Sequence, residues 1–156
     1  MEQLKLTPLT LIGIRLEEKT TNEGGQSNTD CGRLWQQFED QNLAAQIADK
    51  ESEEIYAVYF DYEPGNRQAF SYFIGCRAAA DAEPPVGMSR LVLPGGAYTK
   101  WVARGKMPDC MSQAWQQIRQ SDMKRSFDYD FEVYGPDSRD WNQAVVELFI
   151  ASKESH

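Results

Sequence analysis

The chain has 156 residues, a mass of 17.8 kDa, 41% hydrophobic residues and a formal net charge of −8. A chain of this length buries a hydrophobic core without disulfides or a structural metal, so we expect one domain over residues 1–156. No apolar run approaches the roughly 20 residues that span a bilayer, and the first ten residues lack a signal-peptide pattern, which predicts a cytoplasmic protein with no membrane partner. The acidic excess disfavours direct binding to nucleic acid.

Cysteine and histidine usage narrows the possible chemistry. Cys31, Cys76 and Cys110 are odd in number and widely separated, a pattern that is not typical of a disulfide framework or of a zinc site. The only histidine is the last residue, His156, and a chain terminus does not hold a catalytic base in place. The sequence therefore argues against histidine-dependent hydrolases, and we expect no metal or other cofactor.

The chain begins with a predicted strand and a predicted helix. Residues 9–16, LTLIGIRL, are apolar and rich in branched side chains, which is typical of a buried strand. After a polar loop at 22–28, Thr29 or Asp30 can cap a helix that runs to about Ala48. Its apolar residues recur at a spacing of three to four, so they line one side of the helix.

A predicted hairpin and an irregular segment follow. Residues 55–62 and 70–76 are dense in aromatic and β-branched side chains, and a Pro-Gly turn at 63–68 joins them. Prolines and glycines crowd residues 81–96, which predicts an irregular crossing with a short strand around 89–93.

The second half repeats the same order of elements. Residues 97–104 predict a strand, and Pro108 is well placed for the first turn of a helix. Two further strands at 129–134 and 144–151 form a hairpin around a turn at 135–142.

An internal duplication accounts for this order. The two predicted helices carry the similar strings DCGRLWQQF, from Asp30, and DCMSQAWQQI, from Asp109. We therefore predict an α+β fold of two βαββ units, the first at about 9–78 and the second at about 88–152. A single unit cannot bury its sheet, so the two should form one pseudo-twofold antiparallel sheet with helices on one face and a ligand cleft between the halves.

Glu132 is the candidate for a charged functional group. Strand alternation places it on the face opposite to Phe131 and Val133, in the middle of a predicted central strand. If Glu132 is buried, its desolvation must be compensated and should raise its pKa. The candidate compensating groups are an arginine (Arg15, Arg77 or Arg104), a tyrosine hydroxyl or a cation from outside. The alternative is that Glu132 faces water on a one-sided sheet.

Aromatic residues on the predicted strands suggest what such a carboxylate would bind. The candidate ligand-binding residues are Glu132, Tyr59, Tyr72, Trp101 and Tyr134. A carboxylate enclosed by ring faces favours an organic cation with an apolar body, because aromatic faces attract positive charge. The alternative for each ring is a place in the core, and for Trp35 and Trp115 we expect that role.

Several fragments in a fixed order resemble the gyrase-inhibitor-like domain, also known as the effector-binding domain of AraC-type regulators. The matching pieces are Ile12-Gly13-Ile14, Leu34-Trp35-Gln36-Gln37-Phe38, residues 55–62, Tyr72-Phe73-Ile74-Gly75, Leu93-Pro94-Gly95-Gly96-Ala97-Tyr98, Gly105, Trp115 and Asp130-Phe131-Glu132-Val133-Tyr134. The resemblance implies a duplicated βαββ fold in which Glu132 meets cationic amphipathic compounds in an aromatic pocket. With a first strand starting at Leu9, we expect a stand-alone member similar to the drug-binding module of mobile gene cassettes.

The leading hypothesis is therefore a small-molecule binding module that senses or sequesters cationic, amphipathic, aromatic compounds. Two alternatives remain: a hydrolase of strained cyclopropane-type toxins, with Glu132 and a tyrosine as acid and base, and an inhibitor that contacts DNA gyrase. Possible protein partners are a second copy of the chain or a separate regulator protein. We expect no catalytic residues in the binding module.

Overall fold

The computed structural model describes residues 2–47, 50–65 and 69–153. Three predictions from the sequence concern residues outside these ranges: the end of the first helix at about Ala48, the turn residues 66–68 and the terminal His156. Within the described ranges no helix is both long and apolar enough to span a membrane.

The fold is α+β, as the sequence predicts, with the same order of elements in each half. The first half contains β1 (Glu2–Leu6), β2 (Leu9–Arg15), β3 (Thr20–Thr21), α1 (Gln26–Asp40), α2 (Leu43–Gln46), β4 (Lys50–Phe60) and β5 (Ala69–Ala78). The second half contains β6 (Ser89–Leu93), β7 (Gly96–Gly105), α3 (Asp109–Gln120), β8 (Arg125–Tyr134) and β9 (Ala144–Ser152). Single 3₁₀ turns lie at Glu23–Gly25 and Pro136–Ser138.

The strand order is symmetric about the contact between β4 and β8. It runs β1-β7-β9-β8-β4-β5-β2-β6, with β3 paired to β5. Exchanging β1 with β6, β2 with β7, β4 with β8 and β5 with β9 reverses this order, which is what a pseudo-twofold axis between the halves requires. Apart from β3 and α2, which have no counterpart in the described second half, each half reads strand, strand, helix, hairpin. The extra first strand, β1 or β6, was predicted only for β6.

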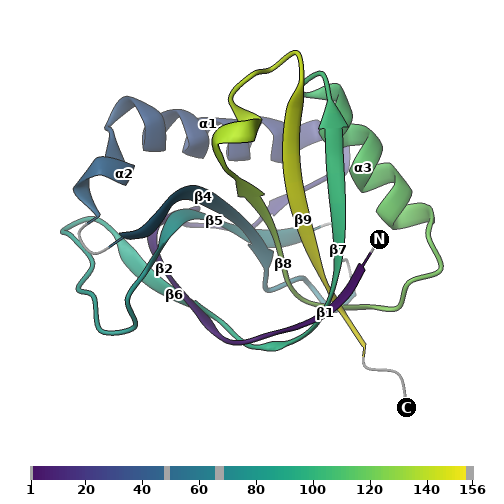
Figure 1. Cartoon of the computed structure of the whole chain (residues 1–156), viewed down its shortest axis with the longest axis horizontal. Coiled ribbons are helices and arrows are strands. Elements are labelled where there is room, and N and C mark those ends of the chain that lie inside the picture. The colour runs from purple at the N-terminus through teal and green to yellow at the C-terminus, as the bar shows by residue number, and fades with distance from the viewer. Residues whose placement is uncertain (1, 48–49, 66–68, 154–156) are drawn as a thin grey trace.

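The sheet curls because its first strands pair across the halves. β1 pairs with β7 and β2 pairs with β6 in one continuous register, in which Leu6 lies opposite Gly96 and Leu9 opposite Leu93. Thr7 and Pro8 separate β1 from β2 on one side of this ladder, and Pro94 and Gly95 separate β6 from β7 on the other. The two edges of the sheet are thereby drawn together beneath its centre (Figure 1).

Separate hydrophobic cores fill the two faces of the sheet. Helices α1 and α3 lie on the same face (Figure 1), where Leu34 and Phe38 of α1 pack on the first half and Ile118 of α3 packs on the second. The opposite, curled face encloses a core of strand residues such as Phe73 and Phe131. The middle stretches of β4 (55–60) and β8 (129–134) are therefore covered on both faces, and Asp130 and Glu132 are their only charged residues.

Helix α1 differs from the prediction at both ends. It begins at Gln26, so the expected cap at Thr29 or Asp30 is wrong, because Gly25 adopts a left-handed conformation (φ 73°) and takes the cap position four residues before Thr29. The Asp30 side chain instead accepts a hydrogen bond from Thr20 Oγ1 at 2.6 Å, which fixes α1 to β3. The helix ends at Asp40, short of Ala48, and the left-handed Asn42 (φ 50°) separates it from α2.

β2 and β5 approach each other closely at a pair of glycines. Gly13 lies opposite Gly75, and a Cβ atom at Gly13 would overlap the backbone carbonyl of Ile74. We expect Gly13→Ala to lower the free energy of unfolding by about 3 kcal/mol, because backbone atoms must move to admit the methyl group. Urea unfolding measures this. Gly65→Ala is the control, since no atom of the described residues lies within 4 Å of its Cβ position, and an equal loss in both variants would contradict the prediction.

Candidate functional site

Glu132 lies at the centre of the sheet, on the face that carries the helices. It is opposite Ala57 of β4 and Leu148 of β9, and its exposed fraction is 2%. Alternation along β8 puts Phe131 and Val133 into the core of the other face. The expectation of a buried carboxylate is therefore confirmed, and the alternative of a solvent-facing Glu132 is wrong.

Three neutral donors hold the Glu132 carboxylate. Trp115 Nε1 and Tyr59 Oη donate to Oε2 at 2.7 and 3.0 Å, and Tyr134 Oη donates to Oε1 at 2.6 Å. Among the described residues, no lysine or arginine forms an ion pair with Glu132. Of the compensating groups considered from the sequence, the tyrosine hydroxyl is the one present, together with an indole that the sequence did not indicate.

The arginines considered as partners have other positions. Arg77 Nε pairs with Glu51 at 3.1 Å, and Arg15 lies 5.0 Å from the ring centre of Phe60. Arg104 is exposed. The negative charge of Glu132 is thus stabilised by dipoles and not by a cation.

Burial dominates the titration behaviour of this site. Desolvation raises the pKa of Glu132, although the hydrogen bonds from Tyr134, Trp115 and Tyr59 lower it in part. Desolvation and then the nearby Glu132 charge raise the pKa of the Tyr59 and Tyr134 hydroxyls well above the usual value. Burial likewise raises the pKa of Cys31 to about 12, and this residue packs against the core beneath α1.

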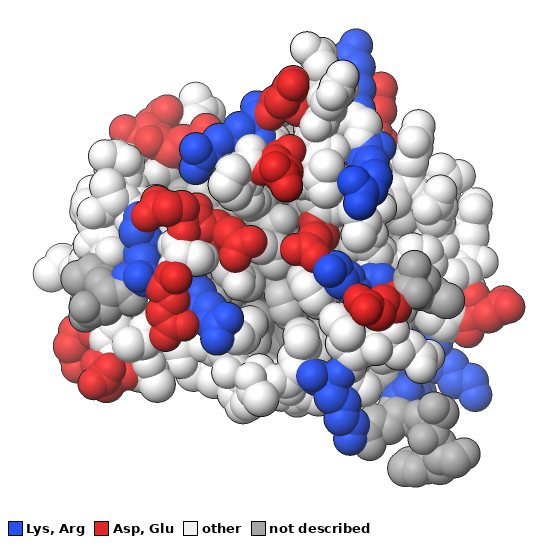
Figure 2. Space-filling model, in the orientation of Figure 1, with Lys and Arg blue, Asp and Glu red and all other residues white. Residues whose placement is uncertain are grey.

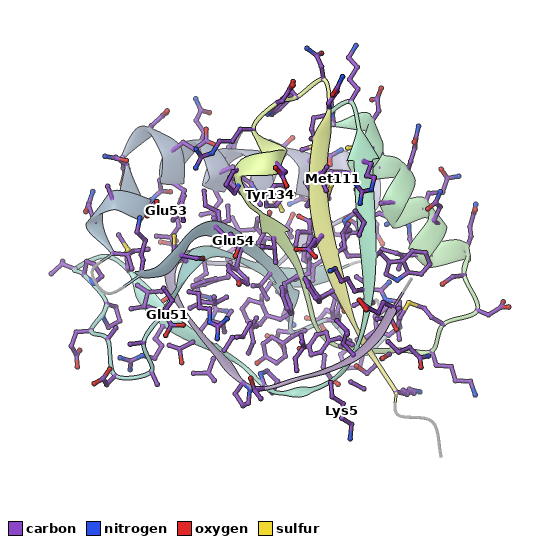
Figure 3. The ribbon with its side chains drawn as sticks, viewed as in Figure 1. Lys5, Glu51, Glu53, Glu54, Met111 and Tyr134 are labelled. Carbon is purple, nitrogen blue, oxygen red and sulfur yellow. The ribbon has the colours of Figure 1, made fainter. Side chains whose placement is uncertain are left out.

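Aromatic rings from both helices cover Glu132. The rings of Trp35 and Tyr134 meet edge to face with centres 5.0 Å apart, and those of Tyr59 and Trp115 with centres 5.2 Å apart. Tyr134 lies at the end of β8 on the side of the helices (Figure 3). All four rings are partly exposed, whereas the carboxylate beneath them is buried. They therefore form a layer between Glu132 and solvent.

The other two predicted ligand residues lie further away. Tyr72 is buried beside Tyr59, with ring centres 5.0 Å apart, and its hydroxyl accepts a hydrogen bond from Trp35 Nε1 at 2.8 Å. Trp101 shares the face of Glu132 but lies two strands away, opposite Leu148, and packs in the core under α3. No hydrogen bond or ring contact joins Trp101 to Glu132 in the part of the chain that the structure describes.

Trp35 and Trp115 pack against the core, as expected, but the sequence did not indicate that their indoles also reach the site. Both indoles donate a hydrogen bond into the polar centre of the site. The available signal was their equivalent place in the two repeats, although the partners differ: the Tyr72 hydroxyl for Trp35 and the Glu132 carboxylate for Trp115.

A second buried carboxylate, Asp130, lies two residues before Glu132 on the same face. Its Oδ2 accepts hydrogen bonds from Tyr62 Oη at 2.6 Å and from Arg125 at 2.7 Å, and its Oδ1 accepts one from the Ala151 amide at 2.8 Å. Desolvation raises the pKa of Asp130 and the Arg125 charge opposes that rise. Unlike Glu132, Asp130 already has a cationic partner.

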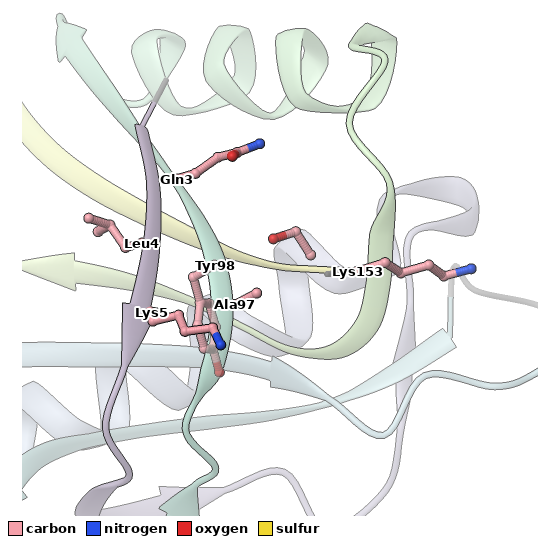
Figure 4. Close-up of a pocket in the computed structure, with 7 residues that line it drawn as sticks. Gln3, Leu4, Lys5, Ala97, Tyr98 and Lys153 are labelled. Carbon is pink, nitrogen blue, oxygen red and sulfur yellow. The ribbon is translucent and has the colours of Figure 1, made fainter. Parts of the chain in front are cut away.

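Two surface hollows lie elsewhere. One of about 240 Å³ opens on the curled face, where acidic side chains border a depression (Figure 2), and Glu54, Tyr56 and Glu147 contribute to its lining. The other, of about 310 Å³, lies between β1 and β7 (Figure 4), beside Lys5 and Tyr98. Glu132 lines neither of these two hollows.

Comparison with known proteins identifies the class. A family model described as Cass2, integron-associated effector binding protein, matches residues 4–151. The chain belongs to this family of effector binding proteins, which confirms the resemblance seen in the sequence. A curated relative, the putative transcriptional regulator protein YobU of Bacillus subtilis (strain 168), is 26% identical over a 125-residue alignment that covers 78% of each chain.

Solved structures share the fold. SAV2435 bound to tetraphenylphosphonium superposes with a TM-score of 0.76 at 18% identity and covers 97% of this chain and 93% of that one. An integron cassette protein from the mobile metagenome of Vibrio cholerae gives a TM-score of 0.72 at 24% identity, with 97% and 95% covered.

Proposed function

We propose that the protein binds lipophilic organic cations, with Glu132 as the counter-charge and Tyr59, Tyr134, Trp35 and Trp115 as ring partners. The observation that carries this proposal is a fully buried carboxylate that has three neutral donors and lies under a layer of aromatic rings. Burying a carboxylate without a cation costs several kcal/mol. A positively charged ligand supplies the missing counter-charge, so its binding recovers part of this desolvation cost. Family membership and the tetraphenylphosphonium bound to SAV2435 support this assignment.

Ligand entry requires the aromatic layer to open between α1 and α3. The carboxylate is buried, but Trp35, Trp115, Tyr59 and Tyr134 each keep one side partly exposed. A cation that displaces the Trp115 indole from Glu132 replaces a neutral hydrogen bond by an ion pair and keeps the ring as a stacking surface. A site based on charge and ring faces accepts ligands of many shapes.

A matched pair of ligands tests the proposal. Methyltriphenylphosphonium is a cation, and triphenylphosphine oxide has the same three rings without net charge. We expect calorimetric titration to show at least about 30-fold tighter binding of the cation. The neutral compound can bind while Glu132 keeps the three hydrogen bonds that it has in the free protein. Part of the affinity therefore remains. Equal affinities would overturn the proposal, as would mass spectra showing that the protein converts the cation into a product.

A further inference from the structure

Arg125 resembles a ligand that is already bound. Its side chain is 14% exposed, and its guanidinium donates to the fully buried Asp130 at 2.7 Å. The guanidinium carbon lies 4.3 Å from the ring centre of Phe127, 5.8 Å from that of Trp115 and 6.0 Å from that of Tyr62. An organic cation thus sits among three rings with a buried carboxylate as its counter-charge, the arrangement proposed for Glu132 and its ligand.

The two carboxylates belong to one site. Asp130 and Glu132 are alternate residues of β8 on the same face, roughly 6–7 Å apart along the strand. Trp115 connects them, because its indole N–H donates to Glu132 while its ring lies near the Arg125 guanidinium. Arg125 neutralises one of the two negative charges, so that a single charge remains for a ligand.

The attachment of Arg125 is local and incomplete. It reaches Asp130 across an irregular stretch of β8, where the pairing with β9 shifts register between these two residues and Phe127 has a positive φ of 59°. The Arg125 Nε atom is buried without a hydrogen-bond partner in the described part of the chain. A free cation with better-placed donors can therefore compete for this position.

We propose that Asp130, Tyr62, Phe127 and Trp115 form a second cation position of the same aromatic site, and that Arg125 occupies it as a tethered guest. Arg125 thereby determines the charge of the ligand: the wild-type site takes singly charged cations, and without Arg125 it takes dications. The statement about ligand charge rests on the proposed function of Glu132. The existence of the second position does not.

Chemical rescue tests the second position alone. Arg125→Ala removes the atoms of an ethylguanidinium ion, so we expect about 10 mM ethylguanidinium to raise the melting temperature of this variant by about 3 °C. Wild-type protein, in which the position is filled, and Arg125→Ala/Asp130→Asn should not respond, nor should any variant respond to neutral ethylurea. If Arg125→Ala does not fold, Arg125→Ser with methylguanidinium gives the same readout, because serine keeps an atom at the Cγ position and lacks those from Cδ outward. No difference between guanidinium and urea would overturn the second position.

A pair of quaternary ammonium ions tests the control of ligand charge. Benzyltrimethylammonium carries one charge, and para-xylylene-bis(trimethylammonium) carries two on either side of one benzene ring. We expect wild type to bind the two within about threefold, and Arg125→Gln to bind the dication at least about tenfold tighter than the monocation. Adding Asp130→Asn should remove that gain.

The outcomes separate the two proposals. An unchanged preference in Arg125→Gln, with monocation binding that still depends on Glu132, overturns the role of Arg125 and leaves the proposed function intact. If neither ion binds wild type or Arg125→Gln while ethylguanidinium still rescues Arg125→Ala, the proposed function of Glu132 fails and the second position stands.

Discussion

Glu132→Gln is expected to weaken the binding of tetraphenylphosphonium about 100-fold, which corresponds to about 2.8 kcal/mol. Glutamine keeps the size of the side chain, and its carbonyl can accept from Tyr59 and Trp115 at the position of Oε2 while Tyr134 rotates its hydroxyl to accept from the amide. The fold is therefore preserved. In Glu132→Gln, however, the cation enters a water-poor site that has no counter-charge. This loss of affinity is expected to exceed the loss seen when a neutral ligand replaces the cation in wild type.

Glu54→Gln is the matched control for this loss. Glu54 is also a glutamate of a central strand, but it lies on β4 and lines the hollow on the opposite, curled face (Figure 3). Calorimetry should give wild-type affinity for Glu54→Gln, because its distance from the ligand lets solvent screen the charge. Similar losses in both variants would mean that the overall negative charge of the protein, and not the buried Glu132, attracts the cation.

The position of Glu132 was predictable because it depends on local pattern alone. Alternation along residues 129–134 fixes which side chains share a face, and the aromatic and branched residues of the neighbouring strands indicate a covered sheet. The central hairpins, the helix after Pro108 and the duplication follow from the same kind of short-range information. These features establish the sheet and one buried acid.

The remaining parts of the site depend on contacts between distant segments. β1 is short and mostly exposed, so its sequence carries no strand pattern, and it forms because β7 offers a pairing edge. The hydrogen bond from Trp115 to Glu132 depends on how α3 packs, and no spacing in the chain encodes it. Arg125 reaches Asp130 only through the irregular start of β8, where the two-residue period is lost.

Stability should fall as the pH rises, because Glu132 is buried. Burial raises its pKa in the folded protein above that of an unfolded glutamate, so between these two values the folded state holds more protons. The contribution of Glu132 to stability is thus fully present below the ordinary glutamate pKa of about 4.3 and is lost as the pH rises through the folded pKa. The slope reaches at most about 1.4 kcal/mol per pH unit.

The difference between wild type and Glu132→Gln isolates this effect. Asp130 is also buried with a raised pKa, but it is present in both proteins and cancels, and the Tyr59 and Tyr134 hydroxyls titrate far above the range concerned. Urea unfolding at a series of pH values should show the free energy of unfolding of Glu132→Gln rising relative to wild type as the pH increases above about 4.3. A difference that stays constant from acid to neutral pH would mean that Glu132 ionises as easily in the folded protein as in water. The site would then lack the uncompensated charge that gives a cation its affinity.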